Sequence, residues 1–405
     1  MSTDTQTLTF QETVAAEPKA VYYAFTNQAM LNQWLCNDAR INASPDGRLY
    51  LYWNQGHHVV GEFTEVEEDK SLAFNWWGKG EPAASHVTVT LAADGHNGTQ
   101  VHITHDGLGT DKTWQNSLDE LTQGWQNSLA NLKSVLEQGL DKRIYDRPLL
   151  GVIPNAQINA EQAAELGLPV PGGVRISGTV PNTGAAKVGL QADDILTKID
   201  DTDITGFAAF APAVAGKSVG TEVEIDFYRD NHKHTVTMPL SSRPAPNIPD
   251  DPAEFAEQIQ QLYTQLDAQL DELLEGVSDA EASISPAAGE WSLKEILCHL
   301  IASERGTQFG IAVQLNGQAL TAFPNNPAAP TAALLAVYPT LTQLVQVWKQ
   351  AEAETIALIK NLPETYVARK VDYLNNGLTL LMGLPGHTQS HYRDMQRILD
   401  TIRRR

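Results

Sequence analysis

Three histidines in the last third of the chain have the type and spacing of a metal-binding set. His387 and His391 are four residues apart, which places both imidazoles on one face of a helix. His299 lies in the apolar run 296–301 of an earlier segment that is also expected to be helical. Neutral imidazole is a good ligand for zinc, nickel, copper or iron, and three protein ligands leave open positions for water or substrate. The pattern therefore predicts a divalent metal site at these three residues.

The elements that must hold these histidines are signalled by helix-capping residues. Asp251 precedes a proline at the first helical position, and Ser292 with Glu295 forms a capping-box pattern. We expect an all-α, up-down four-helix bundle after a proline-rich linker at 244–250. Its predicted helices span residues 252–274, 292–312, 332–361 and 377–402.

The segments EWSLKEILCHLIASE (290–304) and GHTQSHYRD (386–394) resemble the DinB/YfiT family of four-helix bundles. The resemblance covers roughly residues 251–402 and implies that His299, His387 and His391 bind one divalent metal, with zinc, nickel or iron expected. The family includes metal-dependent thiol transferases and hydrolases, as well as members that have lost the metal. Some relatives place the last pair one turn later, at His391 and Met395. Glu304 is expected to orient a ligand or a bound water, although it also fits a solvated or salt-bridged helix position.

Short strands punctuated by glycine and proline turns precede the bundle. The segments LLGV (149–152), GVRI (173–176) and PNTGAAKVGLQADDIL (181–196) resemble the PDZ domains of HtrA-type proteases. This implies a β-barrel-like domain over 142–243 whose loop binds the carboxylate of a protein C-terminus. A groove unused in a PDZ scaffold is the alternative. The expected peptide-contacting residues are Leu150, Gly151, Val152, Phe207, Phe210 and Val214.

Two features qualify that resemblance. The family usually has glycine before the aspartate of its Gly-Asp turn, whereas this chain has Asp193 before Asp194, so the turn is expected to differ. The sequence contains no Gly-x-Ser-x-Gly, His-Glu-x-x-His or phosphate-loop pattern. Proteolysis and nucleotide hydrolysis are therefore not predicted, and no catalytic residue is assigned.

In the first part of the chain we expect a helix over 20–34, followed by alternating strands at 49–53, 59–66, 71–77, 86–91 and 100–105 and an amphipathic helix over 118–136. The segments PKAVYYAFT (18–26), LNQW (31–34), GRLYL (47–51) and GWQNSLANL (124–132) resemble the helix-grip fold of the SRPBCC class, specifically bacterial relatives of the activator of Hsp90 ATPase. This implies an α+β domain over 1–141 with a cavity for an apolar small molecule. Trp53, Trp76 and Trp77 are candidates to line it, or simply to fill the core. His105 is expected at the surface.

Composition limits the partners and the compartment. A length of 405 residues predicts several domains, here a multidomain α+β chain ending in the bundle at 251–405. The net charge of -21 disfavours nucleic acid and membrane surfaces as partners. Two cysteines make a disulfide framework improbable, and the polar N-terminus lacks the pattern of a secretory signal. We expect a cytoplasmic protein.

Two functions fit these features. In the first, the bundle metal serves a thiol transferase or hydrolase. In the second, a non-catalytic adaptor or sensor, related to stress or chaperone systems, combines peptide binding with ligand binding. The absence of a convincing general base beside the histidines weakens the enzyme hypothesis. The presence of several binding modules in one chain favours the adaptor or sensor somewhat, by analogy at the level of folds.

Overall fold

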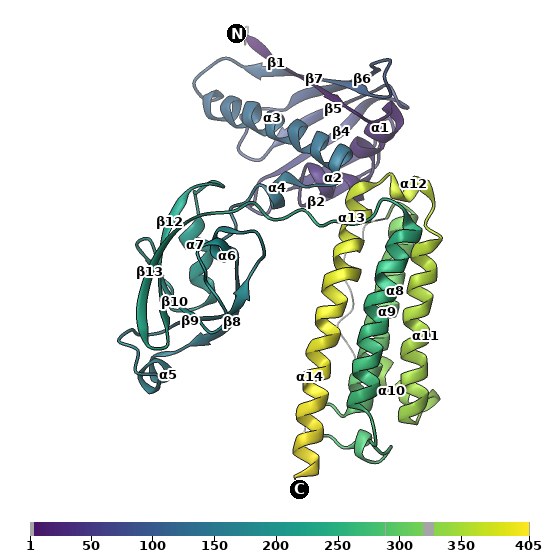
Figure 1. Cartoon of the computed structure of the whole chain (residues 1–405). Helices are drawn as coiled ribbons and strands as arrows, with labels where there is room; N and C mark the ends of the chain where they lie inside the picture. Colours follow the sequence, from purple (N-terminus) through teal and green to yellow (C-terminus); the bar gives the residue numbers. More distant parts are fainter. Residues whose placement is uncertain (1–3, 288, 319–327, 405) are drawn as a thin grey trace. The chain divides into compact units, whose positions relative to one another are not determined.

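The computed structural model describes residues 4–287, 289–318 and 328–404, which form two compact units. One unit comprises residues 1–140 and 246–405 and contains a sheet domain and a helical bundle; the other comprises residues 141–245. Figure 1 shows the sheet domain, the β-rich unit and the long helices of the bundle.

The sheet domain is built on seven antiparallel strands in the order β1-β7-β6-β5-β4-β3-β2. Strand periodicity predicted β3 to β7 to within a few residues, whereas β1 and β2 were not predicted. The strands are β1 (Thr5–Val14), β2 (Asp38–Ile41), β3 (Arg48–Tyr52), β4 (His58–Glu67), β5 (Ser71–Gly78), β6 (Ser85–Ala93) and β7 (Thr99–Gly109).

Helix α3 (Gln115–Gln138) lies along one face of this sheet (Figure 1). Its buried residues recur at three- and four-residue spacing, as an amphipathic helix on a sheet requires: Leu121, Trp125, Leu129, Leu132 and Val135. The single helix predicted from residue 20 to 34 is two helices, α1 (Pro18–Thr26) and α2 (Gln28–Trp34). The break occurs because Asn27 leaves helical geometry, and its side chain caps α2 by accepting a hydrogen bond from the backbone of Met30.

The second unit is a β-rich domain with the strand order β13-β12-β10-β9-β8, with β11 paired to β10. Strand β8 therefore lies at one edge of the sheet. The strands are β8 (Val152–Ile158), β9 (Gly173–Thr179), β10 (Ile195–Ile199), β11 (Thr202–Asp203), β12 (Glu222–Arg229) and β13 (His232–Pro239). The helices are α4 (Lys142–Tyr145), α5 (Ala160–Glu165), α6 (Gly184–Lys187), η1 (Phe207–Ala209) and α7 (Phe210–Val214).

Four long helices form the bundle, side by side in Figure 1. They are α8 (Pro252–Leu273), α9 (Leu293–Leu315), α11 (Leu341–Lys360) and α14 (Leu384–Arg403). Shorter elements connect or extend them: η2 (Glu281–Ser283), α10 (Ala328–Val337), α12 (Glu364–Val367), α13 (Lys370–Leu378) and the π-helical η3 (Thr379–Gly383). The overall class, a helix-grip sheet domain, a PDZ-like sheet and a helical bundle, is as predicted from the sequence.

Prolines explain two departures from the predicted helices. The helix expected over 332–361 is interrupted between α10 and α11 at Pro339, which cannot continue a helical hydrogen-bond ladder. Thr340 then caps α11 with a complete capping box. The last helix begins with Pro385 near its first position, directly after the π-helical turn of η3. This wider turn ends four residues before His387.

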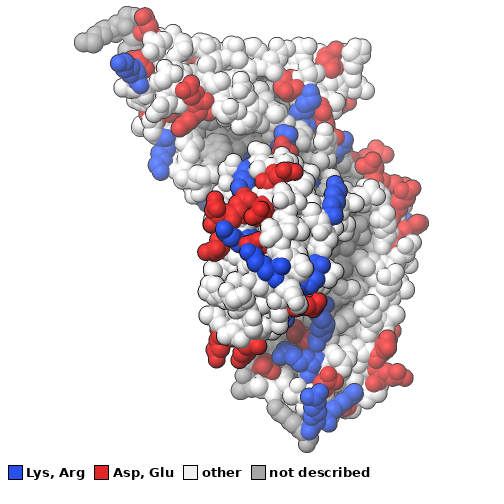
Figure 2. All heavy atoms as spheres, turned by 60° about the vertical axis from the view of Figure 1, so that its left-hand side comes forward, with Lys and Arg blue, Asp and Glu red and all other residues white. Residues whose placement is uncertain are grey.

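Charged side chains of both signs are interspersed on the face that Figure 2 shows, without a continuous basic patch. Within the described ranges, no single helix has the length and hydropathy needed to cross a membrane; α10 and α11 pass that test only as a pair bent by 112°.

Candidate functional site

The three predicted histidines converge between two helices of the bundle. His299 projects from α9, and His387 and His391 project from successive turns of α14. The Nε2 atom of His387 lies 3.0 Å from Nε2 of His299 and 3.1 Å from Nε2 of His391. One nitrogen from each of the three rings lies within 4.8 Å of the others. A single ion can therefore contact all three.

Burial keeps these imidazoles in the form that binds metals. Desolvation lowers the pKa of His299 to about 4, and the two neighbouring histidines lower it as well. Burial likewise lowers the pKa of His387 and of His391. A histidine with a lowered pKa is neutral at pH 7 and has one ring nitrogen with a free lone pair. The cluster therefore presents neutral nitrogen ligands, which suit zinc, nickel or iron.

Trp291 and Asp394 lie beside the histidine cluster, and neither was predicted as a site residue from the sequence. The ring of Trp291 lies 4.9 Å from that of His299 and 6.2 Å from that of His391, measured between centroids. A carboxylate oxygen of Asp394 lies 3.5 Å from Nδ1 of His391. A carboxylate beside the second ring nitrogen orients a ligating histidine and makes it more basic. Its position three residues after His391 is the sequence signal that could have identified Asp394.

Glu304 does not occupy the position expected of it. It accepts hydrogen bonds from the hydroxyls of Tyr263, at 3.0 Å, and Thr355, at 2.5 Å, in the buried interior of the bundle. Glu304 follows His299 by five residues, which turns its side chain to a different face of α9. Asp394, and not Glu304, is the carboxylate that lies beside a ring nitrogen of His391. Met395, the alternative ligand position, is fully buried in the apolar core.

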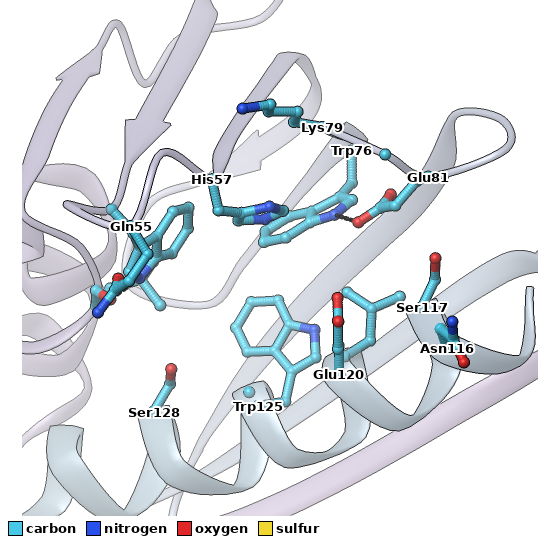
Figure 3. A pocket seen from close by; sticks show the side chains of 15 residues that line it. Gln55, His57, Trp76, Lys79, Glu81, Asn116, Ser117, Glu120, Trp125 and Ser128 are labelled. Carbon is cyan, nitrogen blue, oxygen red and sulfur yellow. Dashed lines mark hydrogen bonds between the residues drawn. The ribbon is translucent and has the colours of Figure 1, made fainter. Parts of the chain in front are cut away.

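A cavity of about 490 Å³ lies between the sheet and α3 of the first domain (Figure 3). Trp53 and Trp76 line it as expected, together with Trp125 from α3. Trp77 does not: its side chain is 59% exposed, because consecutive residues of a strand point to opposite faces of the sheet. The complete lining is Leu35, Trp53, Gln55, His57, Trp76, Lys79, Gly80, Glu81, Asn116, Ser117, Glu120, Leu121, Gly124, Trp125 and Ser128.

His105, expected at the surface, is fully buried behind this cavity. Its Nδ1 accepts a hydrogen bond from the Trp125 indole at 3.1 Å, and its Nε2 lies 2.7 Å from the hydroxyl of Ser85. Burial lowers the pKa of His105 to about 4, so the ring is neutral and its proton sits on Nε2. The histidine thereby fixes the orientation of Trp125. Its burial follows from strand alternation, since Val101, Ile103 and His105 share one face of β7.

The predicted peptide-binding loop has the backbone form that such a loop needs. Gly151 adopts a φ of 81°, and a Cβ placed there would lie 2.4 Å from Oγ1 of Thr183, so only glycine fits. Leu150 is buried, and Val152 begins the edge strand β8. Three further expected residues lie on η1 and α7, where Phe207 is 47% exposed and Phe210 and Val214 pack on the domain core.

Three families match this chain in the predicted order. The family described as activator of Hsp90 ATPase homolog 1-like protein matches residues 15–137. The PDZ domain family matches residues 148–240, and the DinB superfamily matches residues 241–395. The chain therefore contains these three domains in series.

Curated relatives match single parts of the chain. The serine protease Do-like HtrA of Lactococcus lactis subsp. lactis is 31% identical over 119 residues, covering 28% of each protein. The activator of 90 kDa heat shock protein ATPase homolog 1 of Mus musculus is 27% identical, covering 29% of this chain and 33% of that protein. The chain thus spans no more than about a third of the length of either. The solution structure of the Aha1 dimer from Colwellia psychrerythraea is 21% identical, with a TM-score of 0.30, over 33% of this chain and 98% of the other.

Proposed function

We propose that the bundle binds one divalent transition metal through His299, His387 and His391 and uses it in a transferase or hydrolase reaction. The observation that carries this proposal is the convergence of three Nε2 atoms, two pairs of which lie 3.0 and 3.1 Å apart. When bound, such an ion acts as a Lewis acid on a thiol, a water or a carbonyl. Zinc, nickel and iron all accept this set of ligands.

The remaining residues would position the ligands. Asp394 would hold the His391 ring through Nδ1, and Trp291 would cover one side of the cluster. A cavity of about 200 Å³ adjoins His391 and is lined by both of these residues, which offers a small reactant a place beside the ligands. Its remaining lining is Gly289, Glu290, Ile296, Arg397 and Ile398.

Metal content of the full chain tests this proposal. The protein is stripped with a chelator, dialysed against zinc, nickel or iron(II), and measured by atomic emission spectrometry. We expect about one ion per chain, and less than a tenth of that after His387→Ala. The matched control is His102→Ala, which removes an exposed histidine from β7 and leaves the content unchanged.

Activity is measured separately from binding. The loaded protein is offered activated esters and thiol-reactive electrophiles, and turnover that requires the metal supports the enzyme. A protein that binds the ion but turns over none of these substrates favours a sensor. A wild-type protein that retains no metal overturns the metal site itself.

A second function, capture of a protein C-terminus, is supported by a specific observation. Gly151 has the φ required for close backbone approach beside β8, and β8 is an edge strand of its sheet among the residues that the structure describes. An extended peptide can add to such an edge while loop N–H groups hold its carboxylate. Peptides with free and with amidated C-termini distinguish this mode: we expect amidation to weaken binding at least tenfold. Equal binding of both forms contradicts it. We further propose that the protein acts in the cytoplasm.

The first domain is proposed to hold a small molecule with an apolar part. The cavity of about 490 Å³ has the size of a small-molecule site, and three tryptophans line it. Fluorescence of those tryptophans provides the readout for ligand titrations, with an environment-sensitive apolar dye as the first probe. If no apolar compound binds, this part of the proposal is contradicted.

A further inference from the structure

The tryptophans of the first cavity have no indole N–H left for a ligand. Nε1 of Trp53 donates to the backbone oxygen of Leu35 at 2.8 Å, and Nε1 of Trp76 donates to Oε1 of Glu81 at 2.9 Å. Nε1 of Trp125 donates to His105. Indole has only this one donor, so all three rings offer a ligand only carbon and π surface. Such surface attracts apolar groups and cations but not anions.

The charged groups that line the cavity also favour a cation over an anion. Glu81 and Glu120 both line the cavity, and in Figure 3 the Glu120 carboxylate rises from α3 toward Trp76 and Glu81. No lysine or arginine within the described ranges forms an ion pair with either carboxylate. Lys79, the cation among the lining residues that the structure describes, donates to the backbone oxygen of Gly56 at 3.0 Å, and Figure 3 shows its ammonium directed away from Trp76 and Trp125.

Electrostatics around the cavity agree with this arrangement. Burial raises the pKa of Glu81, and the negative charge of Glu120 raises it as well. The negative charge of Glu120 therefore destabilises that of Glu81, and a cation placed beside Glu81 would stabilise it. His57 adds no opposing charge at pH 7, because burial lowers its pKa.

We propose that this cavity selects a small organic cation, with an alkyl- or aryl-ammonium head group beside Glu81 and Glu120 and its apolar part against Trp53, Trp76 and Trp125. The inference rests on the proposed small-molecule site of the first domain and specifies the charge of its ligand. An aromatic box with carboxylates at its edge binds ammonium groups through the ring quadrupoles and direct charge attraction. An anion would meet two carboxylates and no free indole donor.

Three compounds of similar shape and different charge test the proposal on the full chain. Phenyltrimethylammonium, tert-butylbenzene and benzenesulfonate share a phenyl ring and carry one positive, no and one negative charge. Each is titrated at pH 7.5 and 0.15 M salt with tryptophan fluorescence as readout, since three of the eight tryptophans line the cavity. We expect the cation to bind at least tenfold more tightly than the neutral compound, and the anion to bind most weakly.

Two variants test whether the carboxylate of Glu120 causes the preference for a cation. Glu120 is exposed at its position on α3, so Glu120→Gln leaves the fold intact; we expect it to weaken cation binding about five- to tenfold without changing tert-butylbenzene binding. Asp119→Asn removes the preceding, exposed carboxylate, which lies outside the lining, and is expected to change cation affinity less than about twofold.

The outcomes distinguish a failure of the charge selectivity from a failure of the small-molecule site itself. Equal or tighter binding of the neutral compound overturns the charge selectivity and leaves an apolar small-molecule site. Tighter binding of benzenesulfonate also overturns the inference. If none of the three compounds binds, the small-molecule site falls together with it.

Discussion

Glu352 on α11 is a carboxyl group in the interior of the bundle. Only 2% of its surface is exposed, and burial, followed by the nearby Asp267 and Glu304, raises its pKa from 4.5 to about 10. A carboxyl with such a pKa is protonated at neutral pH, because a buried charge without a cationic partner is unfavourable. Burial also raises the pKa of Asp267 and of Glu304. Glu352 is therefore an acid of the bundle core that holds its proton in the folded state.

We predict that Glu352 makes the bundle less stable as pH rises. Between pH 4.5 and about 10 the folded state retains a proton that the unfolded chain has lost, so stability falls with pH across this window. Glu352→Gln is neutral at every pH and should reduce the fall. Amide hydrogen exchange of residues 341–360 at pH 5.5 and 8.5, corrected for intrinsic rates, measures it. We expect protection to fall with pH at least tenfold less in the variant.

The control for this prediction lies one half-turn away on the same helix. Glu354 is exposed, so Glu354→Gln should leave the pH dependence of protection unchanged. An identical pH dependence in wild type and Glu352→Gln would show that Glu352 does not retain its proton in the folded protein.

At the scale of elements, the turn before β10 shows how a sequence departure is accommodated. Asp193 stands where the PDZ resemblance has glycine, and it adopts a φ of 70°. Asp194, the second residue of this turn, is fully buried. It accepts a hydrogen bond from the backbone of Gln191 at 2.8 Å and pairs with Arg229 at 2.7 Å. The turn thus keeps the backbone form that favours glycine, with an aspartate bearing the strain.

We predict that Asp193→Gly is tolerated and Asp193→Val is not. Glycine relieves the left-handed strain but adds chain entropy to the unfolded state, so the net change is within about 1 kcal/mol. Valine is β-branched and should destabilise the PDZ domain by about 1–2 kcal/mol or more. Hydrogen exchange of residues 173–199 compares the three proteins. Equal protection in the valine variant would contradict a strained backbone at this position.

At the scale of the whole molecule, the bundle sequence takes part in the core of the first domain. Val371 on α13 is 5% exposed and belongs to the hydrophobic cluster of the sheet domain. Beside it, the amide of Gln33 donates to the buried carboxylate of Asp372, and the ammonium of Lys370 donates to the backbone oxygen of Glu137. Residues 1–140 and 246–405 thus form one compact unit, although the PDZ segment separates them in sequence.

This arrangement predicts how destabilisation spreads. Val371→Ala should cost about 2 kcal/mol and lower hydrogen-exchange protection in both α3 and α13, because both elements pack around it. Ile199→Ala removes a fully buried side chain from the PDZ core at a cost of about 2–5 kcal/mol. Its effect should be confined to residues 141–245. Loss of protection in α3 after Ile199→Ala would contradict two separate units.

Much of the architecture could be predicted because local patterns reflect local physics. A capping box located the start of α9, and the pair Asp251-Pro252 located the start of α8, each within a residue. Strand alternation located β3 to β7. The break at Pro339 was missed, since the apolar periodicity continues across it. Strand β1 was missed because residues 5–14 are mostly polar on one face and depend on pairing with β7, nearly 100 residues later.

The sequence by itself determined the three domains, their order and the histidines that share a helical face, because periodicity and short motifs depend on neighbours along the chain. Only the tertiary structure decided that the three Nε2 atoms meet, that Glu304 turns to the bundle interior, and that Trp125 lines the cavity while Trp77 faces outward. Those outcomes depend on how helices and strands from distant segments pack together. Packing fixes the direction of each side chain, which spacing along the chain leaves undetermined.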